Sequence, residues 1–206
     1  MKNYLFFLIL LSSTVCGQRY TKAEIALITS GETNSALPIY QTSDSLQHQV
    51  LLSKSRDAKP KNRNTKLLIE RMKKSLLSTQ GGVGIAAPQV GINRNIIWVQ
   101  RFDKEGQPLN YFINPKITWR SQALSLGPEG DLSIAAFRDQ FYRSQAVQVE
   151  YFDTAGKKYT EILEGFTAVI LQHEIDHLSG MLITEKIKDQ SAKIFDEIEL
   201  YKERLD

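Results

Sequence analysis

The sequence predicts an α+β protein, in which strands in the middle of the chain are flanked by helices. Short segments rich in β-branched and aromatic residues lie between residues 95 and 163, which is typical of strands. Apolar residues at helical spacing precede them, at 65–79, and follow them, at 166–178. The chain has 206 residues, enough for one domain with a sizeable core.

The first seventeen residues have the pattern of a secretory signal peptide. Lys2 precedes an unbroken apolar run at 4–11, which is too short to span a bilayer, and small or polar residues follow it. Cleavage after Gly17 would leave residues 18–206 as a single exported domain, periplasmic or secreted. Two alternatives stay open: lipidation of Cys16, which would anchor the chain to a membrane, or an N-terminal core helix that is never removed. Since Cys16 is the only cysteine, the cleaved chain has neither a disulfide nor a thiolate metal ligand.

The segment before the strands contains one clear helix. Residues 24–28 form a short apolar stretch, residues 37–40 are extended in character around Pro38, and residues 53–64 predict a polar surface loop. Leu68, Met72 and Leu76 then recur every four residues, which predicts a helix over 65–79. The two glycines at 81–82 end it.

The strands and the last two helices follow in order. We expect strands at 95–100, 111–113, 117–119, 147–151 and 158–163, with turns at 106–108 and 153–156. A helix over 166–178 ends before Gly180, and residues 187–205 predict a charged amphipathic helix at the C-terminus.

The helix at 166–178 carries an H-E-x-x-H motif. His173 and His177 lie one helical turn apart on the same face, so they can bind one metal ion, and Glu174 can take a proton from a water on that metal. This pattern predicts a metal-dependent hydrolase, although the histidines of a lone motif can be ordinary core or surface residues. The acidic residues downstream of the motif are poor candidates for the third ligand. Glu185 lies too close to the motif, just beyond Gly180, and residues 197 and 199 suit a solvated helix face, so the third ligand stays open.

The charge pattern argues against a nucleic-acid partner. The formal net charge is +3, and basic and acidic residues are mixed along the chain. No basic stripe with interleaved aromatic residues is present in the sequence.

Three segments together resemble the motifs of the peptide deformylases. They are, in order, GVGIAAPQVG at 82–91, GPEGDLS at 127–133 and HEIDHLSG at 173–180, and the resemblance extends from about residue 37 to the C-terminus. It implies a peptide-deformylase-like fold, with antiparallel or mixed sheets around a central H-E-x-x-H helix. The family carries a metal-ligating cysteine in the second motif, and this chain has Asp131 there. The implied ligand set is therefore Asp131, His173 and His177.

The resemblance also implies roles for other residues. Glu174 is the proton carrier, and the Gln89 side chain and the Leu132 backbone N–H are the oxyanion donors. An alternative for Gln89 is a structural amide that bonds a loop. Gly82, Gly84 and Gly130 allow close approach of the backbone to metal and substrate, the Ile85 backbone lines the substrate cleft, and Arg138 lies near its peptide end, with Arg143 as an alternative. Phe166, Val169 and Ile170 share the helix face of His173, so they either form the pocket for a methionine-like side chain or belong to the core.

The implied reaction is hydrolysis of the N-formyl group from an N-terminal formyl-methionine, as part of protein biosynthesis. The expected cofactor is one divalent ion, Fe²⁺ or Zn²⁺, because two histidines and a carboxylate suit both. We expect a monomer that acts on an N-formylated peptide or a related small acylated substrate. Two alternatives stay open: an exported amidohydrolase for another acylated amine or peptide, or a non-catalytic homologue in which Asp131 marks loss of activity.

Overall fold

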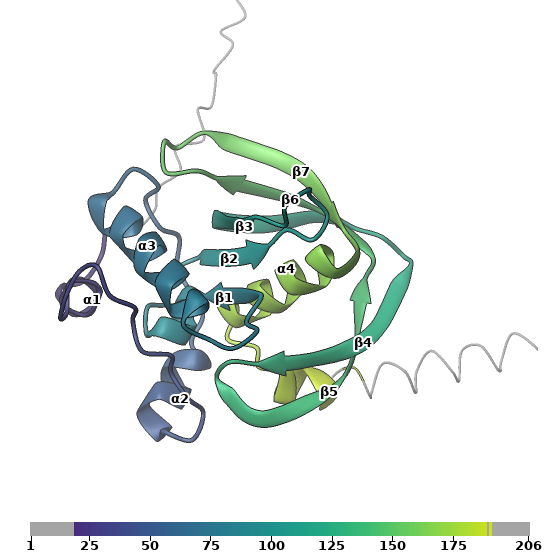
Figure 1. The fold of residues 1–206 in the computed structure, drawn as a ribbon, viewed down its shortest axis with the longest axis horizontal. Coiled ribbons are helices and arrows are strands. Elements are labelled where there is room, and N and C mark those ends of the chain that lie inside the picture. The colour runs from purple at the N-terminus through teal and green to yellow at the C-terminus, as the bar shows by residue number, and fades with distance from the viewer. Residues whose placement is uncertain (1–18, 189, 191–206) are drawn as a thin grey trace, which may run out of the picture.

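The computed structural model describes residues 19–188 and 190 (Figure 1). The predicted signal peptide, with Cys16, and all but the first few residues of the predicted C-terminal helix lie outside this range. The chain is helical at 183–188, so a helix begins there four residues before the predicted start. No helix in the described part of the chain is long and apolar enough to cross a membrane.

Two antiparallel sheets form the β part of the fold. The larger has the order β1-β2-β3-β6-β7. Its strands are β1 (Gly84–Ala86), β2 (Ile96–Gln100), β3 (Leu109–Arg120), β6 (Ala146–Phe152) and β7 (Lys158–Glu164). The smaller pairs β4 (Leu124–Asp131) with β5 (Ile134–Ser144). This arrangement confirms the predicted α+β class.

Helices precede and follow the strands. They are α1 (Lys22–Ile28), α2 (Ser45–Leu51), α3 (Arg63–Leu77), the 3₁₀ helix η1 (Ala87–Val90) and α4 (Gly165–Leu178). The predicted helices at 65–79 and 166–178 are thus confirmed within two residues at each end. No helix was predicted for α2, which begins where the Asp44 carboxylate accepts hydrogen bonds from two backbone N–H groups.

The larger sheet is covered on both faces, which explains the unbroken apolar run of β2. Ile96 and Trp98 belong to the core shared with α3, whereas Ile97 and Val99 belong to the core shared with α4. Successive strand residues point to opposite faces, so both faces of β2 must be apolar. Figure 1 shows α4 in the middle of the molecule, with the larger sheet on one side and β4 and β5 on the other.

The smaller sheet was not predicted from the sequence. β4 contains Gly127, Pro128 and Gly130, residue types that are depleted in strands. Its apolar residues Leu124 and Leu126 are about half exposed, so no buried face produces an alternating pattern. β3 also differs from expectation: it is one strand with irregular register around residues 113–119, where two short strands were predicted.

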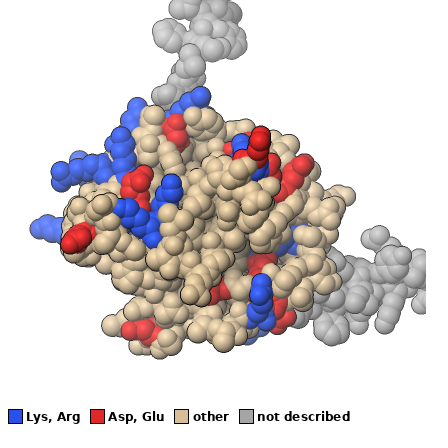
Figure 2. All heavy atoms as spheres, viewed as in Figure 1, with Lys and Arg blue, Asp and Glu red and all other residues tan. Residues whose placement is uncertain are grey.

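Charged side chains are spread over the surface in both signs. In Figure 2, lysine and arginine atoms gather on the left over α3, and acidic atoms lie among them. The middle of this face is mostly uncharged. The lysine and arginine side chains over α3 are therefore the main basic cluster on the face that Figure 2 shows.

Candidate metal centre and substrate cleft

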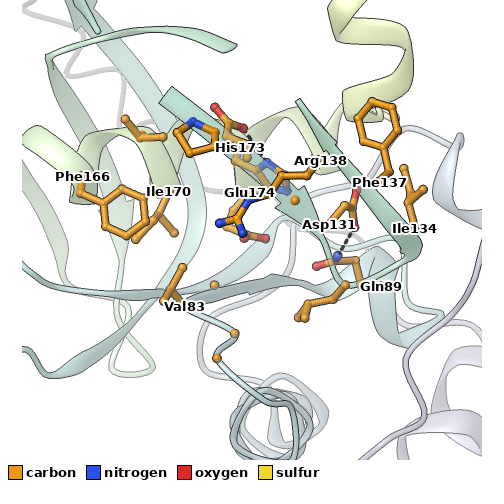
Figure 3. Close-up of a pocket in the computed structure, with 18 of the residues that line it drawn as sticks. Val83, Gln89, Asp131, Ile134, Phe137, Arg138, Phe166, Ile170, His173 and Glu174 are labelled. Carbon is orange, nitrogen blue, oxygen red and sulfur yellow. Dashed lines mark hydrogen bonds and ion pairs between the residues drawn. The ribbon is translucent and has the colours of Figure 1, made fainter. Parts of the chain in front are cut away.

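Two elements that are distant in sequence bring the predicted ligands together. α4 supplies His173 and His177, whose ring centroids are 5.0 Å apart, and the end of β4 supplies Asp131. One potential ligand atom from each of these residues lies within 4.8 Å of the other two. Figure 3 shows Asp131, His173 and Glu174 around one cavity. Asp131, His173 and His177 form a group able to hold a single divalent metal ion.

The polar atoms of this group fit a cation. Asp131 Oδ2 lies 3.4 Å from His177 Nε2, and both side chains are almost completely buried. Neither of these atoms has a hydrogen-bond partner among the described residues, and the same is true of His177 Nδ1. Buried polar atoms without partners are costly, and binding of a cation to the carboxylate oxygen and a ring nitrogen removes much of that cost.

A buried ion network orients His173. Glu129 Oε2 lies 2.9 Å from His173 Nδ1, so this nitrogen donates to the carboxylate and leaves Nε2 for a metal. Arg143 donates to both oxygens of Glu129, at 2.7 and 2.8 Å, and to Asp176 at 2.5 Å. Burial opposes the charge on Glu129, but the hydrogen bonds from Arg143 and His173 lower its pKa to about 2.

The environment shifts the pKa of both histidines. Burial opposes the charge on His173, yet its hydrogen bond to Glu129 and the nearby carboxylates raise its pKa to about 9. Burial lowers the pKa of His177 to about 4, although Asp131 opposes that shift. The neutral imidazole of His177 is the form that binds metals.

Glu174 lies where a carboxylate could exchange protons with a substrate. Burial raises its pKa to about 8, and the Asp131 and Glu129 charges act in the same direction. A Cβ added at Gly84 would lie 2.4 Å from Glu174 Oε1, so only glycine allows this carboxylate so close to β1. The glycine requirement at residue 84 therefore comes from Glu174 and from Ile170, whose Cγ2 would lie 2.8 Å from the added Cβ. A Cβ at Gly130 would meet only an ordinary contact, at 3.5 Å from Phe137 O.

Gln89 makes structural contacts whose partners the sequence did not identify. Its Nε2 donates to Asp131 Oδ1 at 3.1 Å and to Ser133 Oγ at 3.3 Å, and its Oε1 accepts from Ala86 N at 2.9 Å. Asp131 and Gln89 are 42 residues apart, so no local spacing could have revealed this pair. The amide expected to face substrate lies against a metal-ligand candidate.

The cavity has a volume of about 500 Å³. Figure 3 shows Val83, Phe166 and Ile170 on one side of it and Ile134 and Phe137 on the other. Most of the predicted substrate-contacting residues line it, namely Gly82, Gly84, Gly130, Leu132, Arg138, Phe166, Val169 and Ile170. Ile170 lines the cavity and also belongs to the core beneath α4.

Two assignments at the cleft need comment. Ile85 is absent from the cavity lining, and its side chain is fully buried in the core shared with α3, because it points away from Glu174. Gly84 and Val83 line the cleft in its place. Arg143 is only 3% exposed within its ion network, so Arg138 is the arginine that faces the cleft.

Comparison with known proteins places this site in a family. A sequence profile of the polypeptide deformylases matches residues 38–193. The peptide deformylase of Symbiobacterium thermophilum is 39% identical over 138 residues, which are 67% of this chain and 62% of that protein. The peptide deformylase of Thermodesulfovibrio yellowstonii is 36% identical over 148 residues, 71% of this chain and 88% of that protein.

Solved structures agree with the sequence relatives. A peptide deformylase from Thermotoga maritima has a TM-score of 0.65 and 33% identity, covering 73% of this chain and 96% of its own. A Met-Ala-Ser-bound class I type b peptide deformylase from Acinetobacter baumannii has a TM-score of 0.66 and 30% identity, covering 74% and 98%. Because the profile, the relatives and the solved structures all match along most of the chain, it belongs to the polypeptide deformylase family.

Proposed function

We propose that this chain is a metal-dependent hydrolase that removes the formyl group from an N-terminal formyl-methionine of peptides. The observation that carries the proposal is the group formed by Asp131, His173 and His177, with Glu174 beside it at the cavity, in a member of the deformylase family. The Acinetobacter relative bound to Met-Ala-Ser supports a peptide as the occupant of that cavity.

Asp131, His173 and His177 would hold one divalent ion. Two histidines with one carboxylate suit catalytic Zn²⁺ and also Fe²⁺, and these are the two ions we propose. When bound, such an ion acts as a Lewis acid that polarises a carbonyl and makes water more acidic. A carboxylate donates less charge to a metal than a thiolate does. An ion held by Asp131 would therefore be a stronger Lewis acid than one held by a cysteine at the same position.

Glu174 makes both proton transfers, and two other groups stabilise the charge that develops on the carbonyl oxygen. Glu174 accepts a proton from the attacking water, whose oxygen forms a bond to the formyl carbon. The carbon–nitrogen bond then breaks, and Glu174 returns its proton to the leaving nitrogen, giving a free amine and formate. Gln89 and the N–H of Leu132 are proposed to donate to the carbonyl oxygen as it gains charge, which for Gln89 requires an N–H to leave Ser133.

The apolar end of the cavity suits a methionine-like side chain. Phe166 is half exposed and lies with Val169 and Ile170 along the cavity, one to two turns before His173 on α4. Arg138, which is exposed, lines the same cavity and can meet a carbonyl or carboxylate of the peptide. Hydrophobic contact would select the first side chain, and polar contact would orient the backbone.

Formate release from a formyl-Met peptide, measured with metal content in the same preparation, tests the proposal. We expect turnover in the presence of Fe²⁺ or Zn²⁺. Glu174→Ala should retain the metal and lose turnover, whereas Asp131→Ala should lose metal. Unchanged turnover in Glu174→Ala would refute the assigned role of this carboxylate.

The same assay distinguishes the alternatives. A metal-loaded chain that releases no formate but hydrolyses another acylated amine would be an amidohydrolase of different substrate class. If Asp131→Cys creates turnover that the unchanged chain lacks, the chain is a non-catalytic homologue.

A further inference from the structure

The two oxygens of Asp131 have different surroundings. Oδ1 accepts hydrogen bonds from Ser133 N at 2.8 Å and from Gln89 Nε2 at 3.1 Å. Oδ2 is buried without a partner among the described residues and lies 3.4 Å from His177 Nε2. One oxygen is thus held by the protein, while the other faces the histidines.

The Gln89 amide is fixed in the orientation that makes it a donor to Asp131. Ala86 N–H can bond only to an oxygen, and it lies 2.9 Å from Gln89 Oε1. The Nε2 atom must therefore point towards Asp131 and Ser133. Gln89 is 1% exposed, and its backbone oxygen accepts from Tyr40 N at 2.8 Å, so the side chain keeps this orientation even if its N–H bond to Ser133 is exchanged for one to substrate.

The backbone that follows Asp131 at the end of β4 is anchored by hydrogen bonds that do not involve the Gln89 amide. Gln41 Nε2 donates to Leu132 O at 2.9 Å, and Thr42 N donates to Ser133 O at 2.9 Å. Removal of the Gln89 amide therefore leaves the backbone position of Asp131 supported. What it removes is one of two hydrogen bonds that set the rotation of the carboxylate.

We propose that Gln89 is a positioning residue for the metal ligand Asp131: by holding Oδ1 it presents Oδ2 alone to a divalent cation. The inference rests on the metal site proposed above and adds a role for Gln89 separate from donation to substrate. Partners of ligating groups raise metal affinity by about 10- to 100-fold. For a carboxylate, such a partner also decides which of the two oxygens faces the cation. A thiolate has a single ligating atom, so this choice between two atoms is specific to the carboxylate.

The dissociation constant for Zn²⁺, measured by competition with a chelating dye on the full chain, tests this in a four-protein cycle. The proteins are the unchanged chain, Gln89→Met, Asp131→Cys and the double variant. We expect Gln89→Met to weaken Zn²⁺ binding by about 10- to 100-fold when residue 131 is Asp. When it is Cys, we expect a change of less than about threefold.

Two further variants keep the test decisive. Gln89→Asn withdraws the amide by ~1.5 Å but stays polar, so it replaces Gln89→Met if that chain does not fold. Ser133→Ala removes only the weaker 3.3 Å acceptor of Gln89 and keeps the Ser133 N–H bond to Oδ1, so its Zn²⁺ affinity should change little. With Co²⁺ bound, loss of Gln89 should weaken the visible absorption. Asp131 Oδ1 would then be able to bind the ion as well as Oδ2, and the higher coordination number lowers the absorption.

Three results overturn the inference: unchanged Zn²⁺ affinity in Gln89→Met, an equal loss in the Asp131 and Asp131→Cys backgrounds, or no Zn²⁺ binding by the unchanged chain. Failure of the proposed function looks different. A chain that binds Zn²⁺ tightly, shows the expected cycle and releases no formate keeps the positioning role of Gln89 and loses the deformylase activity.

Discussion

The buried ion network around Glu129 yields a quantitative prediction for Arg143→Met. Arg143 is 3% exposed and donates two hydrogen bonds to Glu129, which is 7% exposed, and one to Asp176. Methionine fills similar space and leaves the Glu129 carboxylate buried with only His173 as a partner. Loss of one partner from a buried pair costs about 3–5 kcal/mol in unfolding free energy.

Thermal unfolding of the metal-free protein measures this cost. For a chain of this size, 1 kcal/mol corresponds to about 2–4 °C in Tm, so we expect a decrease of about 6–20 °C. Glu150→Gln is the matched control. It breaks the 2.9 Å pair with Lys158, whose side chain is 52% exposed, and exposed pairs contribute less than about 1 kcal/mol.

A second variant tests the cause of the loss. Replacement of Glu129 and Arg143 together by methionine removes both buried charges, so most of the lost stability should return. The double variant should still bind Zn²⁺ less tightly, because His173 Nδ1 has lost its acceptor. A Tm for Arg143→Met within the range of Glu150→Gln would contradict the role of the network in stability.

Three further predictions concern other parts of the chain. Gly84→Ala should lower Tm and slow formate release, because the added Cβ would lie 2.4 Å from Glu174 Oε1; equal Tm and equal rate would show that β1 shifts freely. Burial opposes the charge on Glu24, but its hydrogen bonds with Arg94 lower its pKa below 4.5. Its ionised form therefore stabilises the fold above pH 4.5, and this contribution disappears as the pH falls through the lowered pKa. The Tm difference between Glu24→Gln and the unchanged chain should shrink as the pH falls below 4.5. A difference that does not depend on pH would contradict the pairing of Glu24 with Arg94. N-terminal sequencing of the protein from expressing cells should begin at Gln18 if the signal peptide is cleaved as proposed, and an intact Met1 would contradict cleavage.

The sequence anticipated the elements whose residues repeat locally. α3 and α4 were found from apolar spacing, and β2, β6 and β7 from runs of β-branched and aromatic residues. The β4–β5 sheet was missed, because Gly127, Pro128 and Gly130 read as a loop and half-exposed leucines gave no alternation. β4 is a strand because it pairs with β5 along its whole length, although its own residues do not favour a strand.

The sequence by itself determined that His173, Glu174 and His177 share one end of a helix. Their spacing of one and four residues fixes that geometry wherever an α-helix forms. Only the tertiary structure decided that Asp131 completes the group, that Glu129 and Arg143 orient His173, and that Gln89 holds Asp131. The hydrogen-bonded pairs among them lie 14 to 44 residues apart, and their contacts arise from the packing of β4, β5 and η1 around α4, which no local repeat encodes.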